Sequence, residues 1–156
     1  MTTPLQTGDR APDFSLPTGA GEAIALRDLE GRKVVLYFYP KDDTEACTAE
    51  AIAFDRLRGQ FADAGAAVIG VSPDTLASHG KFKRKHALAL TLAADETRAA
   101  IEAYGVWREK SLYGRKYMGV ERTTVLIDGQ GRIARVWRKV RVAGHAEQVL
   151  EAARGL

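Results

Sequence analysis

The sequence contains only one cysteine, Cys47, and this scarcity excludes several classes of protein. A chain with one cysteine cannot form an internal disulfide bond, so it does not fit the small secreted proteins that disulfides stabilise. It also lacks the Cys-x-x-Cys pair that a dithiol disulfide reductase needs. We therefore expect a protein of a reducing compartment, the cytoplasm.

Long apolar runs and a leader-like start are also missing. No stretch approaches the roughly 20 apolar residues of a membrane-spanning helix, and the first thirty residues do not combine a basic start with an apolar run. The chain has 156 residues, of which 46% are hydrophobic and 28% charged. This size and composition predict one globular domain over residues 1–156 that is soluble, with no membrane partner.

Recognisable metal-ligand spacing is absent as well. The three histidines, His79, His86 and His145, are not closely spaced with one another or with carboxylates. We therefore expect neither a metal site nor a cofactor. A pairing of one of these histidines with Cys47 for acyl transfer is an alternative that depends on their positions in space.

Charge of one sign is not in large excess, although the net charge is +3. Two basic runs, at 81–85 and 132–141, raise the alternative of nucleic-acid binding. The first run is distributed around a helix rather than along one face, and acidic residues nearly balance the total. We interpret both runs as solvated faces and expect no nucleic-acid partner.

What the sequence does contain is an alternation of strand and helix patterns. Residues 34–39 are continuously apolar and rich in β-branched and aromatic types, which is typical of a strand buried on both faces. Residues 68–71 repeat this pattern. Between them, apolar residues recur at helical spacing over 54–64, and Gly65 offers a stop. The three segments predict a βαβ unit.

The rest of the chain extends this pattern and then changes it. The further predicted elements are an N-terminal hairpin of 14–17 and 23–26, a helix from Asp74 or Thr75 to about His86, a strand at 90–93, a helix from Asp95 to Gly105, a hairpin of 123–127 and 133–137, and a closing helix from about His145. Alternation followed by a hairpin and a helix predicts an α/β fold that is thioredoxin-like, with a mixed central sheet flanked by helices.

Cys47 lies where this fold gathers reactive groups. It follows the end of the strand at 34–39 by a short loop and falls in the first turn of a helix. Free amide hydrogens and the helix dipole stabilise a thiolate there, and reacting groups of open α/β sheets gather at the carboxyl ends of strands. The alternative is that Cys47 is simply a small buried hydrophobic residue.

The residues around Cys47 resemble the peroxiredoxins. Pro40-x-x-x-Thr44-x-x-Cys47 matches their active-site motif, and 37–42 resembles the bacterioferritin-comigratory, or Q-type, branch. Further similar segments are 8–14, 70–74, 104–107 and 119–128. The resemblance implies that Pro40, Thr44, Cys47 and Arg122 form a peroxide site, which Glu50 assists.

The chemistry of a thiol peroxidase explains these residue types. A thiolate must attack one peroxide oxygen while negative charge on the leaving oxygen is stabilised. We assign this stabilisation to Arg122, to the Thr44 hydroxyl and to the backbone amide of Cys47, and expect Arg122 to have the larger effect. Pro40 limits the access of water to the sulfur.

The chain departs from the family pattern at two points. Glu45-Ala46 replaces the Pro-Gly that relatives often carry before the cysteine, and the charge of Glu45 predicts a slower reaction. Ile52 and Lys83 occupy the usual positions of a second, resolving cysteine. We therefore expect one-cysteine turnover by a monomer, in which a thioredoxin, a glutaredoxin or a low-molecular-weight thiol reduces the oxidised sulfur.

The missing second cysteine also supports a rival hypothesis. The chain could be a redox sensor or binding module of the same fold that no longer recycles efficiently, although retention of Thr44 with Cys47 and Arg122 favours an enzyme. A second open question concerns four large apolar residues that either line a mouth for organic hydroperoxides or only pack against the core. They are Trp107, Tyr113, Tyr117 and Met118.

Overall fold

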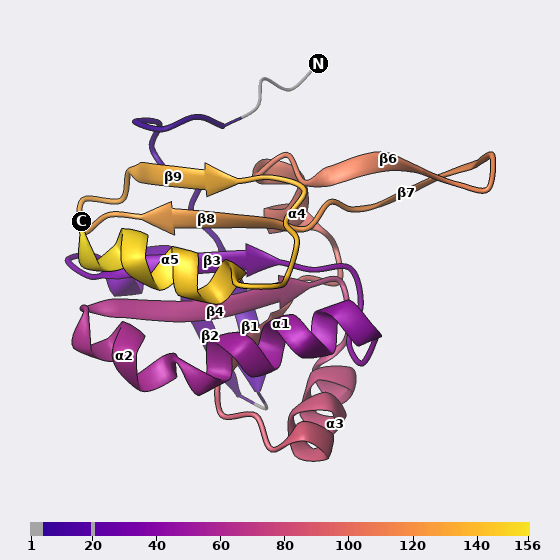
Figure 1. Ribbon diagram of the computed structural model, residues 1–156, viewed down its shortest axis with the longest axis horizontal. Coiled ribbons are helices and arrows are strands. Elements are labelled where there is room, and N and C mark those ends of the chain that lie inside the picture. The colour runs from indigo at the N-terminus through magenta and orange to yellow at the C-terminus, as the bar shows by residue number, and fades with distance from the viewer. Residues whose placement is uncertain (1–4, 20) are drawn as a thin grey trace.

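The computed structural model describes residues 5–19 and 21–156, and its elements surround one central sheet (Figure 1). The sheet has five strands in the order β5-β4-β3-β8-β9. The strands are β3 (Lys33–Phe38), β4 (Ala66–Ser72), β5 (Thr91–Ala94), β8 (Thr123–Ile127) and β9 (Ile133–Trp137). β3, β4 and β5 are parallel to one another, whereas β8 runs antiparallel to both of its neighbours, β3 and β9. The predicted mixed sheet is therefore confirmed.

Helices and a small hairpin cover the two faces of this sheet (Figure 1). One face carries α1 (Glu45–Arg56), α2 (Arg58–Asp63) and α5 (His145–Arg154). The other carries α4 (Ala99–Ala103), the 3-10 helix η1 (Leu26–Leu29) and the hairpin of β1 (Ser15–Gly19) and β2 (Glu22–Ala25). A further helix, α3 (Leu76–His86), packs against β5 and β1.

Strand β3 explains why the core has two halves. Its side chains alternate between the faces, so that Val35 and Tyr37 join the cluster beneath α1 and α5, while Leu36 and Phe38 join the cluster on the other side. All of its residues after Lys33 are almost fully buried. The continuous apolar run predicted this environment, because a strand covered on both faces has no polar side.

A close approach in the sheet depends on Gly70 of β4. A Cβ atom at this position would lie 2.6 Å from the ring of Tyr37 and 2.8 Å from Leu92. The missing side chain lets the Tyr37 ring lie across the neighbouring strand, where it also stacks on Phe54 of α1 at a centroid distance of 4.6 Å. This packing fixes α1 on the sheet.

Most predicted elements are confirmed, with two corrections. The single helix expected over 54–64 is broken at Leu57, whose amide donates to the carbonyls of Phe54 and Asp55, and two helices result. The helix expected to begin at Asp95 begins only at Ala99, because Arg98 adopts a left-handed conformation with φ of 64°. Asp95 still assists it from a distance, since its carboxylate accepts from the Ile101 amide at 2.8 Å.

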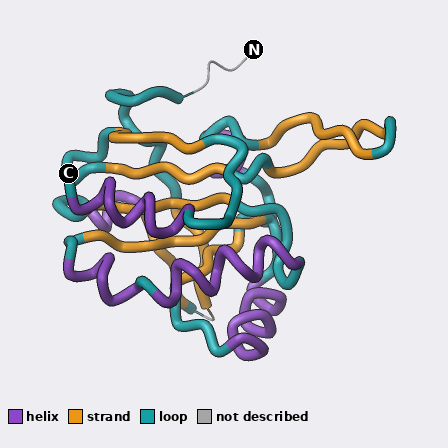
Figure 2. Tube along the Cα trace, in the orientation of Figure 1, coloured by secondary structure: helices purple, strands orange, loops and turns teal. Residues whose placement is uncertain are grey.

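One two-stranded hairpin was not predicted. A hairpin of β6 (Trp107–Leu112) and β7 (Arg115–Val120) leaves the body of the molecule as a separate two-stranded ribbon (Figure 2). Tyr113 and Gly114 form its turn with φ values of 51° and 78°, which suits the right-handed twist of the two strands. Within the described residues, no helix is both long and apolar enough to cross a membrane.

Candidate active site

The first turn of α1 places Cys47 directly beyond the carboxyl end of β3. Thr44 is the N-cap residue and has an extended backbone, with φ of −86° and ψ of 158°, so Cys47 is the third residue of the helix. Free amides and the positive end of the helix dipole lie at this turn. The Cys47 side chain belongs to the buried cluster beneath α1 and is only 1% exposed.

Arg122 reaches Cys47 from the neighbouring strand. It immediately precedes β8, whose first residue, Thr123, pairs with Phe38 at the end of β3. The guanidinium donates one hydrogen bond to Cys47 Sγ at 3.3 Å and another to Glu50 Oε1 at 2.6 Å. Because Cys47 and Glu50 are three residues apart on α1, they lie on the same side of the helix. One arginine therefore contacts both.

Burial sets the electrostatics of this trio. Burial raises the pKa of Glu50 to about 7, and the charge and hydrogen bond of Arg122 only partly oppose it. Burial would lower the pKa of Arg122, but Glu50 and Cys47 raise it above its ordinary value. Glu50 Oε2 is buried without a hydrogen-bond partner among the described residues. The guanidinium stays charged while its carboxylate neighbour is easily protonated.

Thr44 and Pro40 lie near the site by sequence, but neither forms a hydrogen bond to the sulfur among those found in residues 5–19 and 21–156. The Thr44 hydroxyl donates to the carbonyl of Lys41 at 3.0 Å and is exposed. Its lone pairs remain available to a donor. Pro40 is half-buried where the chain leaves β3. The two positions expected for a second cysteine, Ile52 on α1 and Lys83 on α3, are both partly buried.

A second polar cluster lies beside the loop that leads to Cys47, and sequence reasoning missed it. The buried carboxylate of Asp42 accepts from Tyr39 Oη at 2.6 Å, from Ser78 Oγ at 2.8 Å and from His79 Nδ1 at 2.7 Å. Burial would raise the pKa of Asp42, but the bonds from His79 and Tyr39 lower it below its ordinary value. These bonds tie the loop to α3.

The same cluster extends to Asp74. Its carboxylate accepts from the Asp42 amide at 2.8 Å and from Ser72 Oγ at 2.6 Å. Potential ligand atoms of Asp42, Asp74 and His79 lie within 4.8 Å of one another. Hydrogen bonds among these groups and their neighbours account for that proximity, because His79 Nδ1 already faces Asp42 and Nε2 faces the carbonyl of Ala93 at 3.0 Å.

The histidines do not form the pair with Cys47 that acyl transfer requires. His79 contacts Asp42, His86 contacts Asp43 at 2.8 Å, and His145 contacts Thr124 Oγ1 at 2.8 Å. Burial and the nearby charge of Arg122 lower the pKa of His145 to about 4. That ring is therefore neutral at neutral pH and packs at an angle on two aromatic rings, those of Phe54 and Trp137.

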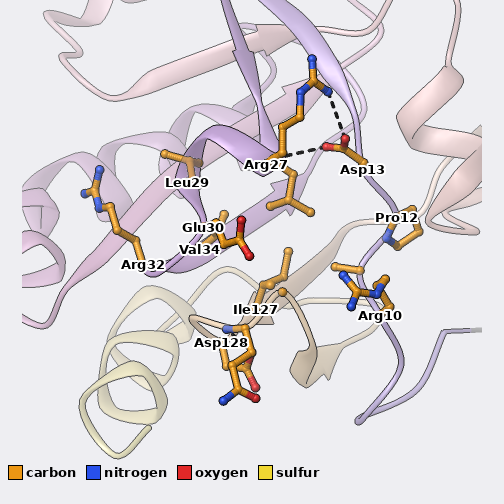
Figure 3. Close-up of a pocket in the computed structure, with 14 residues that line it drawn as sticks. Arg10, Pro12, Asp13, Arg27, Leu29, Glu30, Arg32, Val34, Ile127 and Asp128 are labelled. Atoms are coloured by element: carbon orange, nitrogen blue, oxygen red, sulfur yellow. Dashed lines mark hydrogen bonds and ion pairs between the residues drawn. The ribbon is translucent and has the colours of Figure 1, made fainter.

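Of three cavities, one of about 710 Å³ lies beside α3, and the other two lie at opposite ends of the sheet. One is a groove of about 470 Å³ where Arg122 reaches the surface beside the β6–β7 hairpin. The other, of about 370 Å³, lies near the start of β3 at Val34 and the end of β8 at Ile127, away from Cys47 (Figure 3). Its Arg27 is already paired with Asp13 at 3.0 Å. Of these three cavities, the groove of about 470 Å³ is the one that Arg122 lines.

The four residues considered as an apolar mouth do not form one surface. Tyr113 is 97% exposed at the tip of the hairpin, whereas Trp107 is partly buried at its base. Tyr117 and Met118 are consecutive on β7 and point to opposite faces of the hairpin. Of the four, Tyr117 lines the groove beside Arg122.

The chain is similar to known proteins over most of its length. Residues 7–136 match the model of the AhpC/TSA family. Peroxiredoxin Bcp of Bacillus subtilis is 46% identical over 147 residues, covering 94% of each chain. Peroxiredoxin Bcp of Escherichia coli is 40% identical, also over 147 residues and 94% of each chain.

Solved structures give the same result. A cysteine mutant of Xylella fastidiosa PrxQ is 34% identical, with a TM-score of 0.92 over 99% of this chain and 98% of that one. The bacterioferritin comigratory protein of Xanthomonas campestris, solved in work on its alkyl peroxide reduction activity, is 39% identical, with a TM-score of 0.88 over 97% and 96% of the two chains.

Proposed function

The chain belongs to the AhpC/TSA family, in its bacterioferritin-comigratory peroxiredoxin branch, and from this premise we propose that Cys47, Arg122, Thr44, Pro40 and Glu50 form the site of a one-cysteine peroxidase. The enzyme is a peroxiredoxin that reduces hydroperoxides at the expense of a thiol. The observation that carries the assignment of residues is the 3.3 Å contact between Arg122 Nη2 and Cys47 Sγ at the start of α1.

The proposed first step is a displacement at oxygen. The thiolate of Cys47 attacks the hydroxyl oxygen of the hydroperoxide, the O–O bond breaks, and the alkoxide or hydroxide leaves and takes up a proton. The sulfur retains the OH group as a sulfenic acid. Arg122 stabilises the thiolate before attack. It also stabilises the charge that develops on the leaving oxygen during attack, because its guanidinium has N–H donors beyond those that bind Cys47 and Glu50.

The neighbouring groups have supporting roles in this proposal. Glu50 holds Arg122 through the 2.6 Å hydrogen bond. Thr44 accepts a hydrogen bond from the peroxide OH instead of donating one to the leaving oxygen as its sequence position suggested, since its own proton is directed to the Lys41 carbonyl. Pro40 has no amide hydrogen and shields the sulfur from water. Because Cys47 is 1% exposed, entry of a peroxide requires nearby side chains to move.

The second step requires a thiol from outside the chain, because the sequence has no second cysteine. The incoming thiolate attacks the sulfenic sulfur, water leaves, and a mixed disulfide forms that a further thiol reduces. We propose a thioredoxin, a glutaredoxin or a low-molecular-weight thiol as this reductant, and a monomeric single-domain enzyme of the cytoplasm. The alternative is a redox sensor of the same fold that forms the sulfenic acid but turns over poorly.

The deciding experiment is stopped-flow consumption of hydrogen peroxide and of an organic hydroperoxide by the reduced protein, with the mass of the protein followed in parallel. We expect rapid addition of one oxygen in the wild type and none in Cys47→Ser. Consumption no faster than that of a free thiol would contradict a peroxidase. Fast oxidation without steady turnover by any of the three classes of reductant would favour the sensor.

A further inference from the structure

The groove where Arg122 reaches the surface has an excess of positive charge that the peroxide step does not use. Its walls include Arg108 and Lys110 from β6, Lys139, and Arg122 itself. It also has two acidic residues, each near a cation: Glu121 lies 3.8 Å from Arg108, and Glu109 lies 3.7 Å from Lys116. No ion-pair partner is found for Lys110 or Lys139 among residues 5–19 and 21–156.

Lys110 lines the same groove as Arg122 and is only partly exposed to solvent. It lies opposite Tyr117 in the hairpin, and its stem crosses Gly119, where a Cβ atom would be 3.3 Å from the Lys110 Cδ. Lys110 is partly buried, whereas its neighbours Glu109 and Ser111 on β6 are exposed. The absence of a side chain at Gly119 therefore lets Lys110 lie along the hairpin.

The electrostatics of Lys110 agree with this placement. Burial lowers its pKa, the charge of Arg122 lowers it further, and the charge of Cys47 acts in the opposite direction. Lys110 is thus close enough to Arg122 and Cys47 for their charges to act on it. A cation that is partly desolvated and lacks a carboxylate partner gains more from binding an anion than a fully hydrated lysine does.

We propose that Lys110, with Lys139, binds the carboxylate of the small thiol that reduces oxidised Cys47. This inference rests on the proposed one-cysteine turnover, in which the reductant must come from outside and reach the sulfur beside Arg122. Arg122, whose side chain is 14% exposed, is one of the residues that line the groove. In the reaction, the thiolate attacks the sulfenic sulfur, the S–O bond breaks, the OH leaves with a proton as water, and a disulfide forms.

The test uses three thiols of similar length and different charge: 3-mercaptopropionate, 2-mercaptoethanol and cysteamine. Wild-type protein is oxidised with one equivalent of hydrogen peroxide, and loss of the sulfenic acid is followed by trapping and mass measurement. Each rate is divided by the rate of the same thiol with a small disulfide, which removes its intrinsic reactivity. We expect the corrected rate to be highest for the carboxylate and lowest for the amine.

The variant Lys110→Gln should reduce the preference for the carboxylate over the neutral thiol about five- to tenfold, as loss of one nearby charge at a partly exposed site does. Lys81→Gln is the matched control. Lys81 is an exposed lysine of α3 that does not line the groove, and its loss should leave the preference unchanged. An unchanged preference in Lys110→Gln, or an equal loss in Lys81→Gln, would overturn the proposal.

A second arm separates the reductant from a carboxylated substrate. The oxidation rate is compared for a fatty-acid hydroperoxide and its methyl ester in wild type and Lys110→Gln. If Lys110→Gln alters this ratio but leaves the thiol preference intact, the carboxylate belongs to the peroxide, and the proposal is wrong. Failure of the wild type to form a sulfenic acid with hydrogen peroxide would instead contradict the proposed function itself.

Discussion

Two buried carboxylates flank Cys47 on the chain, and they are in opposite electrostatic states. Asp42 accepts hydrogen bonds from three side chains, and its pKa is below its ordinary value. Glu50 has one partner, Arg122, and burial raises its pKa to about 7. Both side chains are nearly inaccessible to solvent. Low solvent exposure of a side chain therefore does not by itself set its acidity.

Glu50 is the more deeply buried of the two, and the number of donors that replace water adds to the difference. Every hydrogen bond to the ionised form offsets part of the desolvation, and three of them outweigh it at Asp42. At Glu50 one oxygen, Oε2, has no partner among the described residues. We interpret Asp42 as part of the framework that fixes the loop before Cys47, and Glu50 as a group held close to the balance between its two protonation states.

The largest expected effect is on the rate of Cys47 oxidation, when Arg122, the partner of Glu50, is removed. Arg122→Ala should lower the second-order rate of Cys47 oxidation about 10²- to 10³-fold, because it removes donors directed at the reacting atoms. Arg122→Lys should recover only part of this rate, since lysine keeps the charge but not the two-point geometry.

Stopped-flow oxidation by hydrogen peroxide measures these rates. Arg32→Ala, an exposed arginine beside the distant cavity, serves as the control. A loss of less than tenfold in Arg122→Ala would show that the guanidinium is not central to the reaction.

The next largest effect should be on the free energy of unfolding rather than on the rate of oxidation. Asp42→Asn removes a buried carboxylate from beside His79, whose two ring nitrogens face Asp42 and the Ala93 carbonyl. Loss of a charged acceptor that several buried donors share lowers the free energy of unfolding by about 2–3 kcal/mol. Urea denaturation at pH 7 measures it. A variant as stable as the wild type would mean that Asp42 does not stabilise the loop.

Glu50 and Asp42 should make the free energy of unfolding depend on pH in opposite directions. The raised pKa of Glu50 means that between about pH 4.3 and 7 the folded state binds more protons there than the unfolded state. Its contribution to stability is therefore complete below pH 4.3 and is lost as the pH rises through about 7. The lowered pKa of Asp42 acts in reverse, since its contribution is present above the unfolded pKa and is lost on acidification.

Glu50→Gln tests this sign. The variant should remove a decline in stability of at most about 1.4 kcal/mol per pH unit between pH 5 and 7. The free energy of unfolding is measured by urea denaturation across that range for both proteins. Parallel pH profiles in wild type and Glu50→Gln would contradict the raised pKa, whatever the absolute stabilities.

The smallest effect should follow loss of one donor to Asp42. Ser78→Ala removes the 2.8 Å hydrogen bond but leaves those from Tyr39 and His79. We expect a loss of about 1 kcal/mol in the free energy of unfolding. Ser111→Ala, at an exposed position of the hairpin, is the comparison that should change nothing. A loss as large as that in Asp42→Asn would mean that the donors do not act separately.

Periodicity in the sequence predicted the elements that have an apolar side. The strand at 34–39 and the hairpin of 123–127 and 133–137 were identified because their burial is visible in residue type. Arg122 was expected near Cys47 because of a family motif rather than because of periodicity, and the two side chains are in contact. The roles of these residues in catalysis remain predictions.

Other features have no such signal. Asp42 and His79 are 37 residues apart, and a polar residue in a loop resembles a solvated one until the fold buries it. The β6–β7 hairpin is exposed along most of its length, so neither of its faces shows an apolar alternation. The start of α4 was misplaced because the left-handed conformation of Arg98 is uncommon for a residue with a side chain.

The β6–β7 hairpin should be the first ordered part of the molecule to open. A two-stranded ribbon outside the main sheet buries little apolar surface, so its amides should exchange with deuterium through local openings far less costly than global unfolding. The amides of β3, buried in the sheet centre, should exchange only when the whole domain unfolds. Lys110 would then move with the ribbon while Arg122 and Cys47 stay fixed. The groove would therefore open and close without any movement of the reactive sulfur.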